Sequence, residues 1–176
     1  PCDIEHAFKI ALSDGQTWSK TAADARACAL EKAADLMLTQ TEALMALLMH
    51  EAGKTAANAI AEVREAVDFL RYYAAQVRSD FSNDTHHPLG PVVCISPWNF
   101  PLAIFTGQIA AALAMGNGVL AKPAEATSLI AVQATAVLHQ AGVPKTCLQL
   151  VPGEGAVVGP VLCAAPNVSG VCFTGS

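Results

Sequence analysis

The sequence has no apolar run of about 18 residues, the length that a helix needs to cross a lipid bilayer. Its apolar residues, 53% of 176, occur in short runs broken by glycine, proline and charged residues. A basic segment followed by an apolar one, the pattern of a secretory signal, is also missing at the start. We therefore expect no membrane segment, a cytoplasmic location and one globular unit.

Clustered positive charge is missing as well. The chain has 10 Lys and Arg against 15 Asp and Glu, a net charge of −5, and no basic stripe. Binding to nucleic acid requires clustered cations, so we expect no nucleic-acid partner. The six cysteines form no CxxC pair, and we expect neither a disulfide framework nor a metal site. Because Cys28, Cys94 and Cys172 lie in apolar segments, we expect buried, reduced thiols.

The first half of the chain is predicted to be helical. Residues 3–77 are rich in alanine, with apolar residues at helical spacing and breaks at residues 13–15 and 53. In the helix expected over residues 54–77, an apolar face can be told apart from a polar set. The apolar face carries Ile60, Val63, Val67 and Leu70, and the polar set comprises Glu62, Arg64, Glu65 and Arg71. The helical segment is assigned to residues 1–78.

A polar stretch, residues 79–90, is expected to be a connecting loop because it has no apolar face. After it, short apolar strands alternate with amphipathic helices. The expected strands cover residues 92–96, 118–121, 147–151 and 171–173, and the expected helices cover residues 102–114, 128–141 and 156–164. This alternation predicts an α/β fold in which residues 91–176 contribute a parallel sheet covered by helices on both faces.

The segment PVVCISPWNFP, residues 91–101, is typical of a buried strand that ends in a turn bracketed by Pro97 and Pro101. Ligands bind at strand ends in open α/β sheets, so Asn99 in this turn is a candidate for a fixed hydrogen-bond donor. The alternative is that Asn99 caps the helix that follows, and the local spacing by itself favours this second role.

A second strand runs into the loop KPAE, where Lys122 and Glu125 could both hydrogen-bond ribose hydroxyls. A solvent-exposed Lys/Glu pair that contributes almost nothing to stability is an equally common arrangement. Glycines after a strand let the backbone approach a pyrophosphate, although this spacing alone is a weak signal. Such glycines and turns occur at Gly153, Gly155, Gly159 and in the FTGS segment, residues 173–176.

The PWNFP turn, the KPAE loop and the FTGS turn, in this order, resemble the aldehyde dehydrogenase superfamily. The resemblance covers the whole chain and is strongest over residues 88–176. Residues 51–55 and 59–74, with the run PLGPVVCISPWNFPLAIF, are similar to the glutamate-semialdehyde (pyrroline-5-carboxylate) dehydrogenase branch. More narrowly, they resemble the dehydrogenase module of bifunctional proline-utilisation proteins. The resemblance implies that residues 1–176 are part of a Rossmann-like NAD-binding domain.

The activity implied by the resemblance is the NAD-dependent oxidation of L-glutamate γ-semialdehyde to L-glutamate in proline catabolism. In this family a cysteine thiolate attacks the aldehyde, hydride passes to NAD, and a glutamate-activated water hydrolyses the thioester. Two alternatives stay open. One is a different aldehyde substrate, and the other is a non-catalytic module that keeps the fold.

The resemblance also implies roles for single residues. Asn99 matches the asparagine that stabilises the oxyanion of the aldehyde adduct, and Phe100 matches a residue of the aldehyde tunnel. Glu65 lies where the semialdehyde branch has a helix glutamate near the substrate. The sequence slightly favours the competing interpretation of Glu65, a solvent-exposed glutamate on the helix surface.

For the cofactor, Lys122 and Glu125 match residues that contact the adenosine ribose. A carboxylate at Glu125 would repel a 2′-phosphate, so NAD is expected rather than NADP. The other matches to the cofactor cleft are Ser96, Pro97, Trp98, Gly155, Gly159, Gly175 and Ser176.

The sequence stops before the family's general-base glutamate and nucleophilic cysteine, and none of its six cysteines has the sequence context of that nucleophile. We therefore expect the catalytic domain to lie outside these residues and the 176-residue chain to be inactive by itself. The resemblance further implies a small-molecule aldehyde as the substrate and a homo-oligomer at full length.

Overall fold

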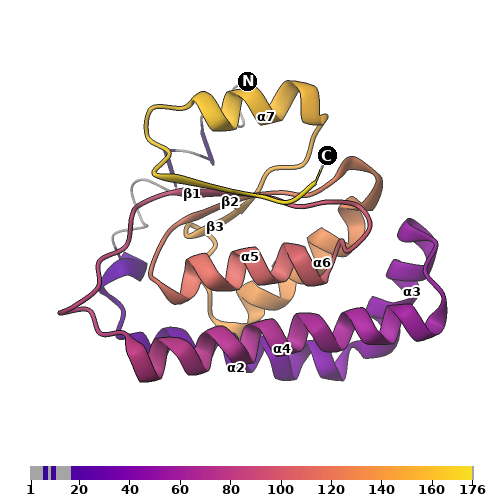
Figure 1. Cartoon of the computed structure of the whole chain (residues 1–176), viewed down its shortest axis with the longest axis horizontal. Coiled ribbons are helices and arrows are strands. Elements are labelled where there is room, and N and C mark those ends of the chain that lie inside the picture. The colour runs from indigo at the N-terminus through magenta and orange to yellow at the C-terminus, as the bar shows by residue number, and fades with distance from the viewer. Residues whose placement is uncertain (1–5, 8, 11–16, 176) are drawn as a thin grey trace.

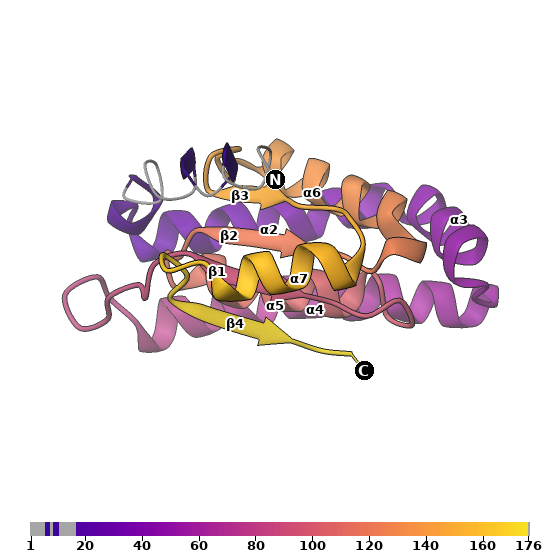
Figure 2. The same ribbon diagram turned by 90° about the horizontal axis from the view of Figure 1, so that it is seen from above.

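Three long helices form an outer layer in the computed structural model, which describes residues 6–7, 9–10 and 17–175 (Figure 1). They are α2 (Ala23–Thr39), α3 (Thr41–Ala52) and α4 (Ala56–Asp80). Helices α2 and α4 lie side by side along the length of the molecule (Figures 1 and 2). Within the described residues, no helix is long and apolar enough to span a membrane.

The second half of the chain alternates strands and helices, as the sequence predicts. The elements are β1 (Val92–Ile95), α5 (Ala103–Ala114), β2 (Val119–Lys122), the 3-10 turn η1 (Glu125–Thr127), α6 (Ser128–Ala141), β3 (Leu148–Leu150), α7 (Gly155–Ala164) and β4 (Gly170–Phe173). All strand pairs are parallel, and the strand order is β3-β2-β1-β4. The order reverses at β1, which creates a switch point between β1 and β4 where sheets of this class bind ligands.

Helices cover both faces of the sheet. Helix α7 lies over one face, and α5 and α6 lie between the other face and the outer helical layer (Figures 1 and 2). Side chains alternate accordingly along β1, where Val93 joins the core under α7 while Val92 and Cys94 join the larger core on the α5 side. The predicted α/β fold with a parallel sheet is confirmed.

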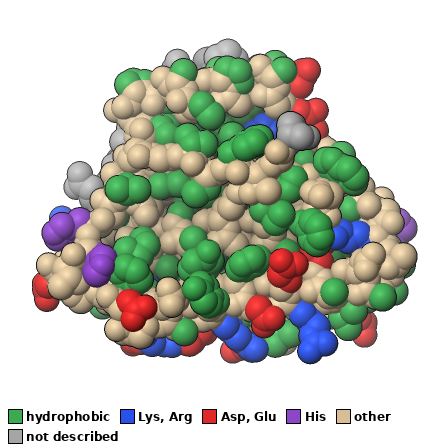
Figure 3. Space-filling model, viewed as in Figure 1, with side chains coloured by type: hydrophobic (Ala, Val, Ile, Leu, Met, Phe, Trp, Pro, Cys, Tyr) green, Lys and Arg blue, Asp and Glu red, His purple; other side chains and the backbone are tan. Residues whose placement is uncertain are grey.

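The face of the molecule along which β4 lies is partly apolar. Figure 3 shows hydrophobic side chains gathered over β4 and over the junction of α4 and α5. The edge strand β4 exposes Val171 and Phe173, and Tyr72 on α4 is also exposed. An unpaired strand edge of this kind is the place where a further strand or another chain can pair.

Helix α5 carries no charged residue in its first or last turn, and its carboxyl end is held by side chains of the N-terminal region. The Arg26 Nε atom donates to the carbonyl of Ala114 at 2.8 Å, and the Trp18 Nε1 atom donates to that of Leu113 at 2.9 Å. Both side chains are buried. A cation at the carboxyl end of a helix stabilises the helix dipole and satisfies carbonyls that lack intrahelical partners.

Glu62 holds the amino end of the same helix. Its Oε1 atom accepts hydrogen bonds from the backbone N–H groups of Leu102 at 2.8 Å and Ala103 at 3.2 Å. The sequence pattern placed Glu62 on the polar side of its helix and Ile60 on the apolar face, and both placements are wrong. Glu62 is buried, whereas Ile60 is 43% exposed, because α4 packs against α5 as well as α2. The other residues of the predicted apolar face, Val63, Val67 and Leu70, are buried as expected.

Two more helices receive a cap from a glutamate of another element. The Glu51 carboxylate accepts from the N–H groups of Leu129 at 2.9 Å and Ile130 at 2.7 Å, at the start of α6. Glu125 accepts from the N–H group of Gly155, at the start of α7. Since none of α5, α6 and α7 has a side-chain hydrogen bond from its own N-cap residue, each depends on a distant carboxylate.

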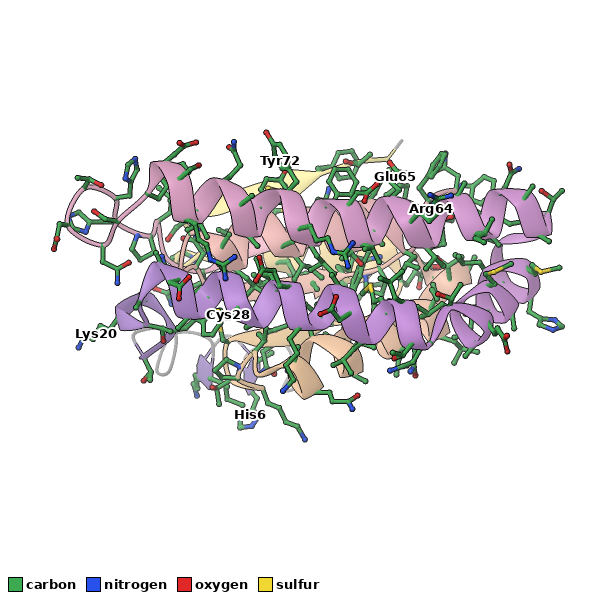
Figure 4. All side chains as sticks on the ribbon, turned by 90° about the horizontal axis from the view of Figure 1, so that it is seen from below. His6, Lys20, Cys28, Arg64, Glu65 and Tyr72 are labelled. Carbon is green, nitrogen blue, oxygen red and sulfur yellow. The ribbon has the colours of Figure 1, made fainter. Side chains whose placement is uncertain are left out.

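The cysteines differ in burial from the expectation. Cys94 is buried as predicted, but Cys28 and Cys172 are exposed. Cys28 lies on the outer side of α2 (Figure 4), where the Arg78 Nη2 atom donates to its Sγ atom at 3.2 Å, and Cys172 lies on the edge strand. Apolar neighbours in the sequence do not reveal which face of a helix or strand edge a residue occupies, so the pattern misled here.

We predict that Arg26→Met lowers the free energy of unfolding by about 2–4 kcal/mol, because the carbonyls that Arg26 serves would lose their donor in a buried place. Urea unfolding followed by circular dichroism measures this change. The matched control is Arg71→Met, whose ion pair with Asp35 is exposed and contributes less than about 1 kcal/mol. Equal destabilisation by the two variants would contradict the role given to Arg26.

Candidate cofactor and active site

A pocket of about 900 Å³ opens at the carboxyl ends of β1, β2 and β4, at the switch point of the sheet. The turn before α5 and the start of α7 complete its walls. All the cofactor residues expected from the sequence that lie within the described range line this pocket: Ser96, Pro97, Trp98, Lys122, Glu125, Gly155, Gly159 and Gly175. Asn99 and Phe100 line it too, whereas Ser176 lies outside the described residues.

The PWNFP turn presents its side chains to the pocket. Asn99 is exposed there, together with Trp98 and Phe100. The alternative role for Asn99, capping the next helix, is wrong, because the N-cap residue of α5 is Leu102 and its first N–H groups bind Glu62. The Asn99 amide is therefore left available to a ligand in the pocket.

Lys54 and Glu62 support this turn from the side of the outer helices. Helix α3 ends at Gly53, whose φ of 64° is in the left-handed region that favours glycine, and Lys54 follows directly. The Lys54 Nζ atom lies 2.5 Å from Glu62 Oε2 and 4.1 Å from the centroid of the Phe100 ring. Neither residue of this ion pair was predicted to have a role, although Lys54 lies in the EAGKT stretch that carried part of the resemblance.

Lys122 and Glu125 lie on the opposite wall. Lys122 is buried, so the interpretation of an exposed surface pair is wrong for it, and its Nζ atom donates to the Pro123 carbonyl at 2.9 Å. Burial lowers the pKa of Lys122, and the carboxylate of Glu125 acts in the opposite direction. A Cβ atom on Gly155 would lie 3.5 Å from Glu125 Oε1 and 3.8 Å from Lys122 Nζ. Glycine at this position keeps the space between both charges and the start of α7 open.

A buried hydroxyl in the pocket has no hydrogen-bond partner among the described residues. It belongs to Ser96, which is 4% exposed and follows β1 directly. An unsatisfied buried polar group costs about 1–3 kcal/mol, so a ligand that bonds to the Ser96 hydroxyl would regain that energy. With Lys122, Glu125 and the glycine-started helix α7, the pocket offers the hydroxyl-binding and anion-binding groups that a dinucleotide requires.

Glu65 is not among the residues that line the pocket. It is exposed on α4, one helical turn after Glu62, and Figure 4 shows it with Tyr72 on the side of the helix turned toward β4. The part of the chain that the structure describes does not bring Glu65 together with Asn99 and Phe100. Its assignment to the substrate stays a prediction.

Two cysteines lie beside the pocket without entering it. Cys94 of β1 and Cys172 of β4 are direct partners in the strand register. A hydrogen bond from the Cys94 thiol lowers the pKa of Cys172 to about 6, while that bond and burial raise the pKa of Cys94. Neither thiol is part of the pocket lining, so the acidity of Cys172 does not make it the nucleophile of this site.

Comparison with known proteins agrees with this geometry. The aldehyde dehydrogenase family model matches residues 1–176. Bifunctional protein PutA of Salmonella typhimurium is 63% identical over 174 residues, which cover 99% of this chain and 13% of PutA. The 1-pyrroline-5-carboxylate dehydrogenase of a Geobacillus species is 41% identical over 184 residues, which cover 98% of this chain and 36% of the relative.

A solved structure of 1-pyrroline-5-carboxylate dehydrogenase from Thermus with bound NAD matches this chain with a TM-score of 0.90 at 35% identity. The match covers 97% of this chain and 36% of that one, and thus includes both the helical layer and the sheet. The chain spans a minor part of the length of each of these relatives. Sequence, pocket and fold agree, and the chain belongs to the aldehyde dehydrogenase family.

Proposed function

We propose that this chain is part of the NAD-binding domain of an enzyme that oxidises L-glutamate γ-semialdehyde to L-glutamate in proline catabolism. The observation that carries the proposal is the pocket, which brings the Asn99 turn, the KPAE loop and the start of α7 to one switch point. Similarity to PutA and to 1-pyrroline-5-carboxylate dehydrogenase supports the substrate. The NAD bound to the Thermus relative supports the cofactor.

In this proposal the residues of the chain bind and orient. Lys122 and Glu125 hold the adenosine ribose, while Ser96 and the glycines at the start of α7 line the cleft for the rest of the cofactor. When bound, NAD accepts the hydride that leaves the substrate. Asn99 donates its side-chain N–H to the oxygen that becomes negative when the aldehyde is attacked, and Phe100 forms part of the wall beside it.

The other reacting groups are assigned to a longer polypeptide. We propose that the nucleophilic cysteine and the general-base glutamate come from a catalytic domain outside residues 1–176, and that these residues alone have no activity. Residues 1–78 serve as the helical segment, 79–90 as the connecting loop and 91–176 as the Rossmann-like part. The proposal includes that the full-length enzyme is a homo-oligomer, as the family resemblance implies, and that it lies in the cytoplasm.

A different aldehyde is the second candidate substrate. The pocket residues assigned here contact the cofactor and the oxyanion. The cofactor and the oxyanion are the same for every aldehyde substrate, so these residues do not select one aldehyde. The observation that favours this candidate is the position of Glu65, which is exposed and outside the pocket lining.

The first prediction concerns activity and uses the full-length polypeptide that contains this sequence. We expect it to reduce NAD with glutamate γ-semialdehyde in preference to a panel of simple aldehydes. We expect residues 1–176 alone to reduce no NAD. Asn99→Ala should lower kcat by about 10²–10³-fold, because one preorganised oxyanion donor is lost. Preference for another aldehyde would remove the substrate assignment. Absence of turnover with every aldehyde would favour a non-catalytic module.

The second prediction separates substrate recognition from shared chemistry. Glu65→Gln should raise KM for glutamate γ-semialdehyde about tenfold, because the carboxylate would no longer face the substrate's ammonium group. KM for simple aldehydes, which lack that group, should not change. Asp68→Asn is the matched control, since Asp68 is a second exposed acid on the same helix. An identical KM in the wild type and the Glu65 variant would place Glu65 on the solvated helix surface.

The third prediction concerns the choice between NAD and NADP. Glu125→Gln removes the charge but keeps an oxygen that can accept the N–H group of Gly155, so the start of α7 stays capped. We expect the ratio of kcat/KM for NAD over NADP to fall about tenfold, because the repulsion of the 2′-phosphate is relieved. Steady-state kinetics with both cofactors gives the ratio. An unchanged ratio would show that Glu125 does not contact the ribose.

A further inference from the structure

The carboxylate of Glu62 joins three separate segments of the chain. Its Oε1 atom binds the first N–H groups of α5, at Leu102 and Ala103, and its Oε2 atom meets the ammonium of Lys54 at 2.5 Å. The Glu62 side chain is fully buried. A buried carboxylate is tolerated only when it is paired and hydrogen-bonded, so these contacts must persist together in the folded protein.

Lys54 extends this connection to the pocket wall. Its side chain is 11% exposed, and its Nζ atom lies over the ring of Phe100 at 4.1 Å from the centroid. An ammonium over an aromatic face is attracted by the negative face of the ring. The other side of the Phe100 ring is not enclosed, because the residue is 41% exposed and lines the pocket. Lys54 therefore holds the Phe100 ring by the face that is turned away from the pocket.

The backbone between these contacts is short and hydrogen-bonded. The Phe100 carbonyl accepts the N–H group of Ile104 at 3.2 Å, so a hydrogen bond ties Phe100 to the first turn of α5. Asn99 precedes Phe100 directly, and among the described residues no hydrogen bond or ion pair holds its side chain. The position of the Asn99 amide thus follows from the anchored residues on its carboxyl side.

We propose that Lys54 and Glu62 are a positioning pair. The pair holds the Asn99–Phe100 turn in the position from which both side chains reach the reacting aldehyde. The inference rests on the proposed function, because it assigns the pair to the oxyanion donor and the tunnel wall of that reaction. The pair touches neither substrate nor cofactor. It acts through the first turn of α5 and through the Phe100 ring.

Glu51 provides a matched control within the same chain. It caps α6 with both carboxylate oxygens, Oε1 at Leu129 and Oε2 at Ile130, whereas Glu62 caps α5 with Oε1 alone. No residue of α6 lines the pocket, and among the described residues no lysine pairs with Glu51. Glu51→Gln and Glu62→Gln both keep an oxygen that can accept from the helix, so both variants are expected to fold. Both substitutions remove one negative charge from the amino end of a helix, and Glu51→Gln also exchanges one of the two accepting oxygens for an NH2 group.

The kinetic test uses the full-length enzyme with the aldehyde that the wild type oxidises best, at saturating aldehyde and varied NAD. Glu62→Gln and Lys54→Met should each lower kcat about 10–100-fold while KM for NAD stays unchanged, because small misplacements of a catalytic group cost this much. The double variant should lose no more than the worse single one, and Lys54→Arg should recover most of the activity. Glu51→Gln should lower the thermal midpoint but leave kcat at the wild-type value.

Hydrogen exchange supplies a readout that does not need turnover. In Glu62→Gln the amides of Leu102 and Ala103 should exchange faster, with those of Leu129 and Ile130 unchanged, and Glu51→Gln should show the reverse. Wild-type kcat in Glu62→Gln, or unchanged exchange at Leu102 and Ala103, would overturn the inference. A wild type that oxidises no aldehyde would instead refute the proposed function, and the inference would fall with it.

Discussion

Helix α5 depends on charges that it does not carry. It lies between the sheet and the outer helices and has no charged residue in its first or last turn. Glu62 supplies a carboxylate to its amino end, and Arg26 supplies a guanidinium to its carboxyl end. These signs match the helix dipole. Both side chains are buried, so loss of either contact would leave a buried polar group without a hydrogen-bond partner. The α/β half therefore depends on the helical layer for its stability.

The pocket takes its geometry from elements that are anchored in this way. The PWNFP turn connects β1 directly to α5, so its position is set at one end by the sheet and at the other by Glu62. On the opposite wall, Glu125 ties the loop after β2 to the start of α7. Each wall of the pocket thus has a carboxylate bound to a helix amino terminus at its edge. Rigid supports of this kind are what a site needs when it must orient a cofactor and a substrate closely.

The local pattern of the sequence was sufficient for the strands and helices of the second half, whereas most residues of the pocket were predicted from the family resemblance. Strand and helix positions after residue 90 agree with the structure within a few residues, because apolar periodicity is a local signal. The roles of Glu62 and Arg26 were not predictable, because their partners lie 40 and 88 residues away along the chain. For the same reason Asn99 was expected to cap α5, since nothing near it in the sequence reveals that a carboxylate from α4 already does so. The family resemblance, rather than the spacing, supplied its catalytic role.

The most direct measurement is a crystal structure of the full-length enzyme with NAD bound. We expect the adenosine ribose to lie against Lys122 and Glu125, and the cofactor to lie in the pocket between β1 and β4. The Asn99 amide should lie beside the nucleophilic cysteine, where the oxyanion of the adduct forms, and Glu62 should keep its bonds to Leu102 and Ala103. NAD bound elsewhere, or an Asn99 side chain turned away from the place of the oxyanion, would refute the proposed roles.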